Sequence, residues 1–323
     1  MPESATDGPP IFIVGVHRSG TTLLRYMLNS SPRIYIPPES DFIPRFFGRY
    51  PDHPLTEKQV DSLLATIFTR YRFVGEWRGE RPEAAAFLAA MADRSPAAFL
   101  DTLYSQYTEQ NGAVRWGDKT PIYASYVDLL ARLFPQAQFV HIIRDGRDVA
   151  LSMLEKWGQK EWHIDLYFTA RNWVRRIRQA RASGARLGAA RYYELRYEAL
   201  TQDPAGQLKP LCQFLGEPYL PEMAEPDRLG RARIEPGAFH AAVRQPPNTA
   251  RVGRWQREMT PADLWLFQRV AGQLLMELGY PWAAVGRPAG FAGGGRWLAL
   301  RAKYEVLQGG RRVLQTFGLM PPI

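Results

Sequence analysis

A loop at residues 15–22 carries the residue types of a phosphate-binding site. Its sequence, GVHRSGTT, follows the apolar run IFIV at 11–14 and precedes apolar residues spaced as on one face of a helix. A strand that turns through glycines into a helix directs backbone N–H groups and the positive end of the helix dipole at one place. The sequence therefore predicts that this loop binds an anion.

The loop differs from the ATP-binding P-loop at one position. Gly15, Gly20 and Thr22 match the pattern GxxxxGK[ST], but Thr21 stands where that pattern has lysine. Without this lysine a triphosphate site lacks the group that reaches the β- and γ-phosphates. The positive charge lies at Arg18 instead, which favours an anion other than ATP poised for γ-phosphoryl transfer. A plain strand-to-helix turn is the simpler alternative, but the register of the glycines and threonines disfavours it.

A second candidate anion site follows the apolar run FVHII at 139–143. Arg144 ends this predicted strand, where kinases of the P-loop class have an acidic residue that helps to hold Mg²⁺. Ser152 and Lys156 lie on one face of the helix that follows, so all three side chains could bind a phosphate. The alternative is that Arg144 pairs with Asp148. Two anion sites without a metal-binding carboxylate suggest a nucleotide with phosphates at both ends.

These motifs resemble those of sulfotransferases that use 3′-phosphoadenosine-5′-phosphosulfate. Loop 17–22 is similar to their 5′-phosphosulfate loop, Arg144 with Ser152 to their 3′-phosphate motif, and the GRW at 253–255 to an element whose basic residue closes over the nucleotide. The run 11–45 has an RSGTT loop, a Glu shortly after the first helix and then IPR, and most resembles tyrosylprotein sulfotransferases and their bacterial relatives. The resemblance covers roughly residues 10–280.

The resemblance implies a role for each matching residue. Glu39 is expected to be the catalytic base, with a pKa raised by burial, while Arg18 and Lys119 stabilise the transferring sulfonate and the bridging oxygen without a metal. The implied nucleotide-binding residues are His17, Arg18, Ser19, Gly20, Thr21, Thr22, Arg144, Ser152, Lys156, Tyr197, Arg251, Gly253 and Arg254.

Other interpretations of the two central residues stay open. Glu39 could be a solvated carboxylate or a cap for the helix that follows it, and Lys119 could be a surface lysine. The rival candidates for the base are Asp41, Asp118 and His17. The other histidines show no metal-ligand spacing and are expected to be structural.

Predicted strands alternate with predicted helices along the chain. Strands are expected at 114–117, 139–143 and 191–195 besides 11–14, and helices at 123–133, 163–187 and 261–278. This alternation predicts an α/β fold, a P-loop-like parallel sheet flanked by helices, with ligands beyond the carboxyl ends of its strands. A helical insertion is expected at about 55–111. The sulfotransferase domain would cover residues 1–285, with a linker and a basic helical tail at 286–323.

Composition limits the class of protein. The 41 Lys and Arg against 32 Asp and Glu give a net charge of +9, which suits anionic ligands, but no basic block or zinc-ligand spacing points to nucleic acid. The single cysteine, Cys212, excludes an intramolecular disulfide and fits a reducing compartment. Residues 1–10 do not resemble a signal peptide, and no segment approaches the roughly 20 apolar residues of a membrane span. We expect a cytoplasmic protein.

The predicted function is transfer of a sulfonate from the nucleotide to a hydroxyl of a small molecule, sugar, lipid or phenol. A P-loop kinase with an altered loop and a non-catalytic nucleotide-binding protein are the alternatives. Segments 55–111 and 220–248 are expected to shape the acceptor pocket, and the latter to be irregular. The apolar stripe of the tail, Trp297 to Leu307, is expected to dock on the core or on a partner rather than on a membrane surface. The acceptor and the oligomeric state cannot be read from the sequence.

Overall fold

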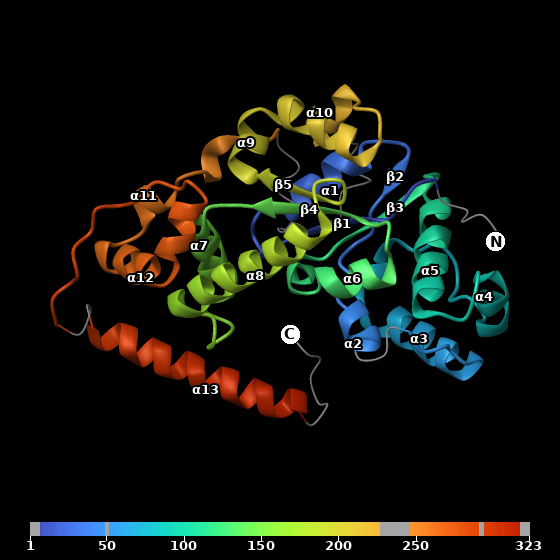
Figure 1. The fold of residues 1–323 in the computed structure, drawn as a ribbon, viewed down its shortest axis with the longest axis horizontal. Helices are drawn as coiled ribbons and strands as arrows, with labels where there is room; N and C mark the ends of the chain where they lie inside the picture. The colour runs from blue at the N-terminus through green and yellow to red at the C-terminus, as the bar shows by residue number, and fades with distance from the viewer. Residues whose placement is uncertain (1–6, 49–51, 227–245, 291–293, 317–323) are drawn as a thin grey trace.

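A five-stranded parallel sheet lies at the centre of the computed structural model, which describes residues 7–48, 52–226, 246–290 and 294–316 (Figure 1). The strands lie in the order β2-β3-β1-β4-β5, and each hydrogen-bonded pair is parallel. They are β1 (Ile11–Gly15), β2 (Ile34–Tyr35), β3 (Arg115–Lys119), β4 (Gln138–Ile143) and β5 (Tyr192–Arg196). The predicted α/β fold is confirmed, although β3 runs two residues further than predicted and includes Lys119.

Helices cover both faces of the sheet, as the apolar sequence of β1 requires. Successive side chains of a strand point to opposite faces, so Ile13 packs with Leu24 of α1 (Thr21–Asn29), whereas Phe12 packs with residues of α6 (Val127–Leu133). Figure 1 shows α9 (Tyr197–Gln202) and α10 (Pro204–Leu215) on the face of α1, and α8 (Leu166–Leu187) with α6 on the other.

The expected helical insertion lies between β2 and β3, next to the edge of the sheet. It follows α2 (Ile43–Phe47) and consists of α3 (Glu57–Arg70), the 3₁₀ helix η1 (Arg72–Glu76), α4 (Ala84–Ala90) and α5 (Pro96–Gln110). Aromatic rings attach it to the sheet, because Tyr104 of α5 stacks on Trp116 of β3 with centroids 4.5 Å apart. Phe73 of η1 packs edge-on against Tyr104 at 4.9 Å.

The remaining helices follow β3, β4 and β5 in the chain. They are α7 (Gly146–Trp157), α11 (Trp255–Glu258), α12 (Pro261–Glu277), α13 (Arg296–Thr316) and the 3₁₀ helices η2 (Pro121–Ser125), η3 (Pro221–Ala224) and η7 (Thr249–Arg251). The predicted helix 163–187 begins instead at Leu166, because the Asp165 side chain accepts a hydrogen bond from Phe168 N and caps it. The helix predicted at 123–133 is divided into η2 and α6.

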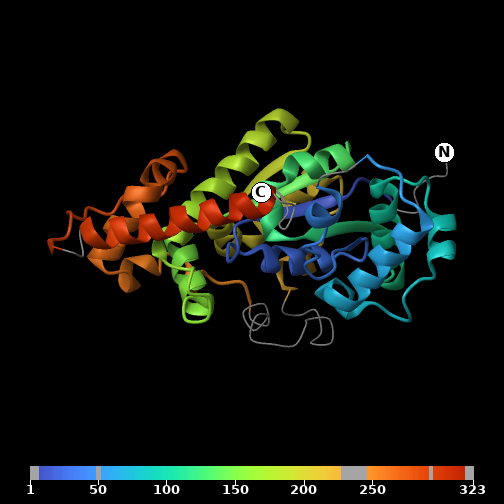
Figure 2. The same cartoon turned by 90° about the horizontal axis from the view of Figure 1, so that it is seen from below.

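The C-terminal helix α13 packs on the core of the molecule, which is one of the two positions expected for the tail, the other being a partner protein. Tyr304 is buried against Tyr167 of α8, Lys303 forms an ion pair with Asp165 at 2.7 Å, and Arg296 pairs with Asp263 at 2.7 Å. Figure 2 shows α13 crossing the molecule from the side of α12. None of the helices that the structure describes is long and apolar enough to span a membrane.

A buried ion pair joins the amino-terminal ends of the central strands to α10. Arg115 of β3 donates to Glu217 at 3.0 Å, to Leu215 O at 2.6 Å and to Gln138 of β4 at 2.6 Å. The side chains of Arg115 and Glu217 are 2% and 3% exposed. A charge at this depth depends on its partner, because water cannot replace it.

We therefore expect Glu217→Ala to lower the free energy of unfolding by about 3–5 kcal/mol, since it leaves the Arg115 charge buried and unpaired. Asp52→Ala is the matched control, because it breaks the ion pair between Asp52 and Arg132, whose side chains are both exposed. That change should cost about 0–1 kcal/mol. Urea denaturation measures the free energy of unfolding of both variants. Equal losses would show that the buried ion pair stabilises the protein no more than the exposed one.

Candidate active site

The predicted site residues meet at the carboxyl ends of the strands. The loop after β1, Glu39 after β2, Arg144 after β4 and Tyr197 after β5 line one cleft of about 610 Å³. Lys119, the last residue of β3, pairs with Glu39 at this edge. Parallel strands place their carboxyl ends on the same edge, which explains how residues more than 150 positions apart come together.

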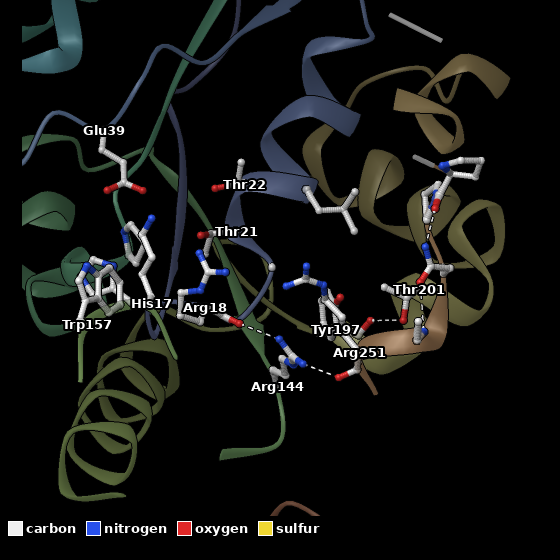
Figure 3. Close-up of a pocket in the computed structure, with 18 residues that line it drawn as sticks. His17, Arg18, Thr21, Thr22, Glu39, Arg144, Trp157, Tyr197, Thr201 and Arg251 are labelled. Carbon is white, nitrogen blue, oxygen red and sulfur yellow. Dashed lines mark hydrogen bonds between the residues drawn. The ribbon is translucent and has the colours of Figure 1, made fainter. Parts of the chain in front are cut away.

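The cleft has two ends, which Figure 3 shows on either side of the loop after β1. Glu39, His17 and Trp157 lie at one end, and Tyr197, Thr201 and Arg251 lie at the other. Arg18 and Thr21 lie between them, so a ligand that fills the cleft passes the loop. The other lining residues are Gly20, Thr22, Leu23, Pro121, Arg144, Lys156, Pro246, Pro247, Asn248 and Ala250.

The backbone of the loop is fixed by close packing. Gly20 has φ of 95° and lies at the N-cap of α1, where a Cβ atom would be 2.3 Å from the Tyr197 ring. Arg18 adopts φ of 71°, in the left-handed region that non-glycine residues seldom occupy. Ser19 is buried, and its Oγ has no hydrogen-bond partner among the described residues. A loop with this geometry can present N–H groups and a hydroxyl to an anion.

Arginines concentrate positive charge around the loop. Arg18 Nε donates to Ser152 Oγ of α7 at 2.9 Å, and Arg144 Nη1 donates to Arg18 O at 3.0 Å. Burial first, and then the charges of Arg251 and Arg144, lower the pKa of Arg18. Arg144 lies over the Tyr197 ring with 4.6 Å to the centroid, and its Nε has no partner among the described residues. The site is thus built to receive negative charge.

Arg144 pairs with Asp148, as the alternative for this residue had it, and it also lines the cleft in which it was predicted to bind an anion. Its guanidinium lies 3.7 Å from the buried carboxylate of Asp148. Asp148 further accepts hydrogen bonds from Gly253 N at 2.8 Å and Trp255 N at 3.0 Å. Asp148 therefore joins the arginine to the segment that begins at η7.

This segment contributes one of its three predicted site residues to the cleft. Arg251 lines the cleft, and its carbonyl oxygen accepts from Arg144 Nη2 at 2.5 Å. Gly253 bonds to Asp148, whereas Arg254 forms ion pairs with Glu155 and Glu258 and is not among the lining residues. Most of segment 220–248, which was expected to shape the acceptor pocket, lies outside the described residues, as does His240.

Glu39 and Lys119 form an ion pair at the end of the cleft where His17 and Trp157 also lie. Lys119 Nζ donates to Glu39 Oε1 at 2.5 Å, and the lysine side chain is 5% exposed, so it is no surface lysine. Glu39 does not cap α2, which has Phe42 at its N-cap without a side-chain hydrogen bond. The predicted rise in the pKa of Glu39 is wrong: burial alone would raise it, but the attraction to Lys119 and the other nearby positive charges leaves it below its usual value.

The three rival bases differ in access and charge. Asp118 is buried and accepts hydrogen bonds from Ser40 at 2.7 Å and Tyr104 at 2.5 Å, and burial raises its pKa. His17 packs on Trp157 and is neutral at pH 7, because burial and the charge of Arg176 lower its pKa to about 4. Asp41 has φ of 54° and is exposed. Desolvation by the neighbouring protein and then the charge of Glu39 nevertheless raise its pKa to about 6.

Sequence reasoning missed several residues of the site. Trp157 and Thr201 line the cleft, and Ser40 positions the Glu39 loop through its hydrogen bonds to Asp118 and Tyr123. Only the position of Trp157, directly after Lys156, gave a signal in the sequence. Among the residues that the structure describes, no group of His, Cys, Asp and Glu side chains is arranged to hold a metal ion.

With this geometry in place, comparison with known proteins identifies the class. Residues 9–222 match the model of the sulfotransferase family, and the chain belongs to that family. The expected resemblance to sulfotransferases is confirmed.

Individual relatives agree with this assignment. The omega-hydroxy-beta-dihydromenaquinone-9 sulfotransferase Stf3 of Mycobacterium bovis is 27% identical over 69% of this chain and 68% of its own length. Protein-tyrosine sulfotransferase 1 of Danio rerio is 26% identical over 85% of this chain and 73% of its own. An uncharacterized protein of Aquifex aeolicus is 28% identical over 65% of this chain and 26% of its own length, so the chain spans about a quarter of that relative.

A solved structure shares the fold. The sulfotransferase domain of the Synechococcus PCC 7002 olefin synthase superposes with a TM-score of 0.62 and 25% identity, and the alignment covers 87% of this chain and 98% of the domain.

The glycine at the N-cap of α1 gives a test of the loop. Gly20→Ala should destabilise the protein by more than the roughly 1–2 kcal/mol of a left-handed alanine, because the new Cβ also meets the Tyr197 ring. Gly112→Ala is the control: Gly112 has φ of 71° but nothing within 4 Å of a built Cβ. Chemical denaturation compares the two variants, and an equal loss of stability would contradict the close packing against Tyr197.

Proposed function

We propose that the cleft binds 3′-phosphoadenosine-5′-phosphosulfate and transfers its sulfonate to a hydroxyl group of an acceptor. The observation that carries the proposal is the pair of anion-binding groups at neighbouring strand ends, the loop at the N-terminus of α1 and Arg144 after β4. Two buried polar atoms, Ser19 Oγ and Arg144 Nε, have no hydrogen-bond partner among the described residues. Buried polar atoms are normally satisfied, so an unpartnered one on Arg144, which lines the cleft, and another in the loop beside it support binding of a polar ligand there.

Each half of the donor has a matching set of residues. The loop N–H groups and Arg18 would bind the 5′-phosphosulfate, since they combine a helix N-terminus with a guanidinium. Arg144 would bind the 3′-phosphate, together with Ser152, whose hydroxyl now accepts from Arg18 Nε. Lys156 lines the same cleft, and Tyr197 lies under the Arg144 guanidinium.

The transfer needs a base, a path in line with the bond that breaks and cations near the leaving group. The acceptor oxygen forms a bond to sulfur while the bond from sulfur to the 5′-phosphate oxygen breaks, which releases 3′-phosphoadenosine 5′-phosphate. Glu39 takes the proton of the acceptor hydroxyl. Lys119 and Arg18 stabilise the negative charge that develops on the sulfonate and the bridging oxygen.

Glu39 is the best placed of the candidate bases. It lines the cleft, it is held by a buried lysine, and the low pKa that this pairing causes keeps it ionised at neutral pH. Asp118 is enclosed by its hydrogen bonds to Ser40 and Tyr104, which leaves Asp41 and the neutral His17 as the other candidates. The lowered pKa weakens Glu39 as a base, so the reaction relies more on the alignment of acceptor and donor.

A hydroxyl acceptor is consistent with the relatives. Stf3 is named for a hydroxylated dihydromenaquinone and the Danio rerio enzyme for protein tyrosine, so both names specify hydroxyl-bearing acceptors.

The buried, free thiol of Cys212 is in keeping with a reducing, cytoplasmic location.

Glu39→Gln should lower turnover by about 10²–10⁴-fold while binding of 3′-phosphoadenosine 5′-phosphate is retained. A base works only when it is deprotonated, so its activity falls as the pH drops through its pKa. With Glu39 as base, kcat/KM should hold until the pH drops below the ordinary glutamate value of 4.5, because the pKa of Glu39 is lowered. Initial rates with radiolabelled donor over this pH range measure both effects.

Asp41→Asn serves as the matched change. If Asp41 were the base, kcat/KM would fall near pH 6, where its raised pKa lies, and Asp41→Asn rather than Glu39→Gln would abolish turnover. Full activity of Glu39→Gln would refute the role of Glu39. Mg²⁺-dependent transfer of the γ-phosphate of ATP would favour a kinase, and no transfer from either nucleotide would favour a non-catalytic binding protein.

Arg144→Ala should weaken binding of 3′-phosphoadenosine 5′-phosphate by about 10–100-fold, because a charge-assisted hydrogen bond to phosphate is lost. Adenosine 5′-phosphate, which has no 3′-phosphate, should bind both forms almost equally. The exposed Arg186, which pairs with Asp128 on the surface, provides the control Arg186→Ala. Calorimetry that finds unchanged affinity in Arg144→Ala would show that Arg144 does not bind the 3′-phosphate.

A further inference from the structure

A second cluster of positive charge lies along α8, outside the residues assigned to the nucleotide. Arg175 and Arg176 are neighbours on this helix, and Arg311 of α13 is close enough to lower the pKa of both. Arg176 is only 7% exposed. Its Nε donates to the neutral amide oxygen of Asn172 at 2.8 Å, and neither Arg175 nor Arg176 forms an ion pair with a described residue.

Buried polar atoms without partners gather around these two arginines. Arg175 Nε and Arg176 Nη1 have no hydrogen-bond partner among the described residues, and the same holds for Gln179 Oε1 one turn further along α8. Ser125 Oγ, at the end of η2 that packs on α8, is also unpartnered. These N–H donors, the amide oxygen and the hydroxyl thus lie on α8 and on the element packed against it, and no described residue bonds to them.

Such an arrangement costs stability in the free protein. A buried guanidinium without an acid is unfavourable, and neighbouring like charges make it more so. Burial and the charge of Arg175 lower the pKa of Arg176 to about 9, so Arg176 still carries its charge at neutral pH. Binding sites commonly accept such a cost, because a ligand of opposite charge offsets it.

The cluster lies next to a wall of the cleft, because η2, which packs on α8, carries Pro121 in the cleft lining. Arg176 is the charge that most lowers the pKa of His17, and it also lowers the pKa of Asp41. His17 lies beside Glu39 and Trp157, away from Tyr197 and Arg251 (Figure 3). An anion bound at Arg176 would therefore lie on the side of His17 and Asp41, next to Glu39.

We propose that Arg175 and Arg176 of α8 bind an anionic group of the acceptor, and that the acceptor is therefore an acidic molecule whose hydroxyl reaches Glu39. The shared chemistry is a carboxylate or a phosphate that accepts from Arg175 Nε and Arg176 Nη1. This inference rests on the proposed function, because it assigns the anion to the acceptor of that reaction.

Two probes distinguish the sources of the anion. The full chain is saturated with 3′-phosphoadenosine 5′-phosphate, so that the loop and Arg144 are occupied, and is then titrated with benzoate or with glycerol 1-phosphate in a calorimeter. Saturable binding of benzoate indicates a carboxylate acceptor, and binding of glycerol 1-phosphate indicates a phosphorylated one. Either should weaken about tenfold or more in Arg176→Gln, because a charge-assisted hydrogen bond is lost.

Three variants make the result specific. Arg178→Gln lies on the same helix but removes an exposed side chain that pairs with Glu277, and should leave the probe affinity unchanged. Arg176→Lys keeps the charge and should retain part of the affinity. Should Arg176→Gln fail to fold, Arg175→Gln, at a half-buried position, should show the same loss.

The outcomes separate this inference from the proposed function. If 3′-phosphoadenosine 5′-phosphate binds but neither probe does, or if the probe affinity is equal in wild type and Arg176→Gln, the anion site on α8 is refuted while the proposed function stands. If the nucleotide itself does not bind, the proposed function fails, and the same titrations without nucleotide still test the site. Binding that is lost equally in Arg178→Gln would also overturn the proposal.

Discussion

The interaction of Asp148 with its three neighbours holds the candidate active site together. Arg18, Arg144 and Arg251 repel one another, and the charges of Arg251 and Arg144 add to burial in lowering the pKa of Arg18. Asp148, in the first turn of α7, lies 3.7 Å from Arg144 and accepts from the backbone N–H groups of Gly253 and Trp255. One buried carboxylate thereby offsets part of the repulsion and fixes the segment that carries Arg251. The site keeps an excess of positive charge, which an anionic ligand can offset.

The parallel sheet supplies the frame for this interaction. Because every strand points the same way, the loops after β1, β2, β4 and β5 meet at one edge, and the close packing of Gly20 on Tyr197 joins the first of these loops to the last. A parallel sheet must be covered on both faces, which the apolar β1 requires and the flanking helices provide. The insertion between β2 and β3 is attached by aromatic stacking and holds Asp118 through Tyr104, while Tyr123 of η2 bonds to Ser40.

Glu39 and Asp41 show how the surroundings of a carboxylate set the direction of its pKa shift. Burial was expected to raise the pKa of Glu39, yet Lys119 lies 2.5 Å away and the net shift is downward. Asp41, two residues on, has a raised pKa, because desolvation by the surrounding protein and then the charge of Glu39 disfavour its ionised form. It has no cationic partner at hydrogen-bond distance among the described residues. The pKa values of the two carboxylates are therefore shifted in opposite directions, and the position of Lys119 decides the difference.

The sequence by itself determined the α/β class, the glycine loop between β1 and α1, the basic residue after β4 and the membership of the sulfotransferase family. These features depend on local patterns: an apolar strand, glycines at fixed spacing and a charged residue where a strand ends. Only the tertiary structure decided that Lys119 pairs with Glu39, that Arg144 is bound by Asp148 and that Arg254 pairs with Glu155. It also decided that Arg176 is buried with no ion pair to any residue that the structure describes. These partners are joined by the packing of separate elements, and the charge or pKa that results is set by atoms that are distant in the sequence.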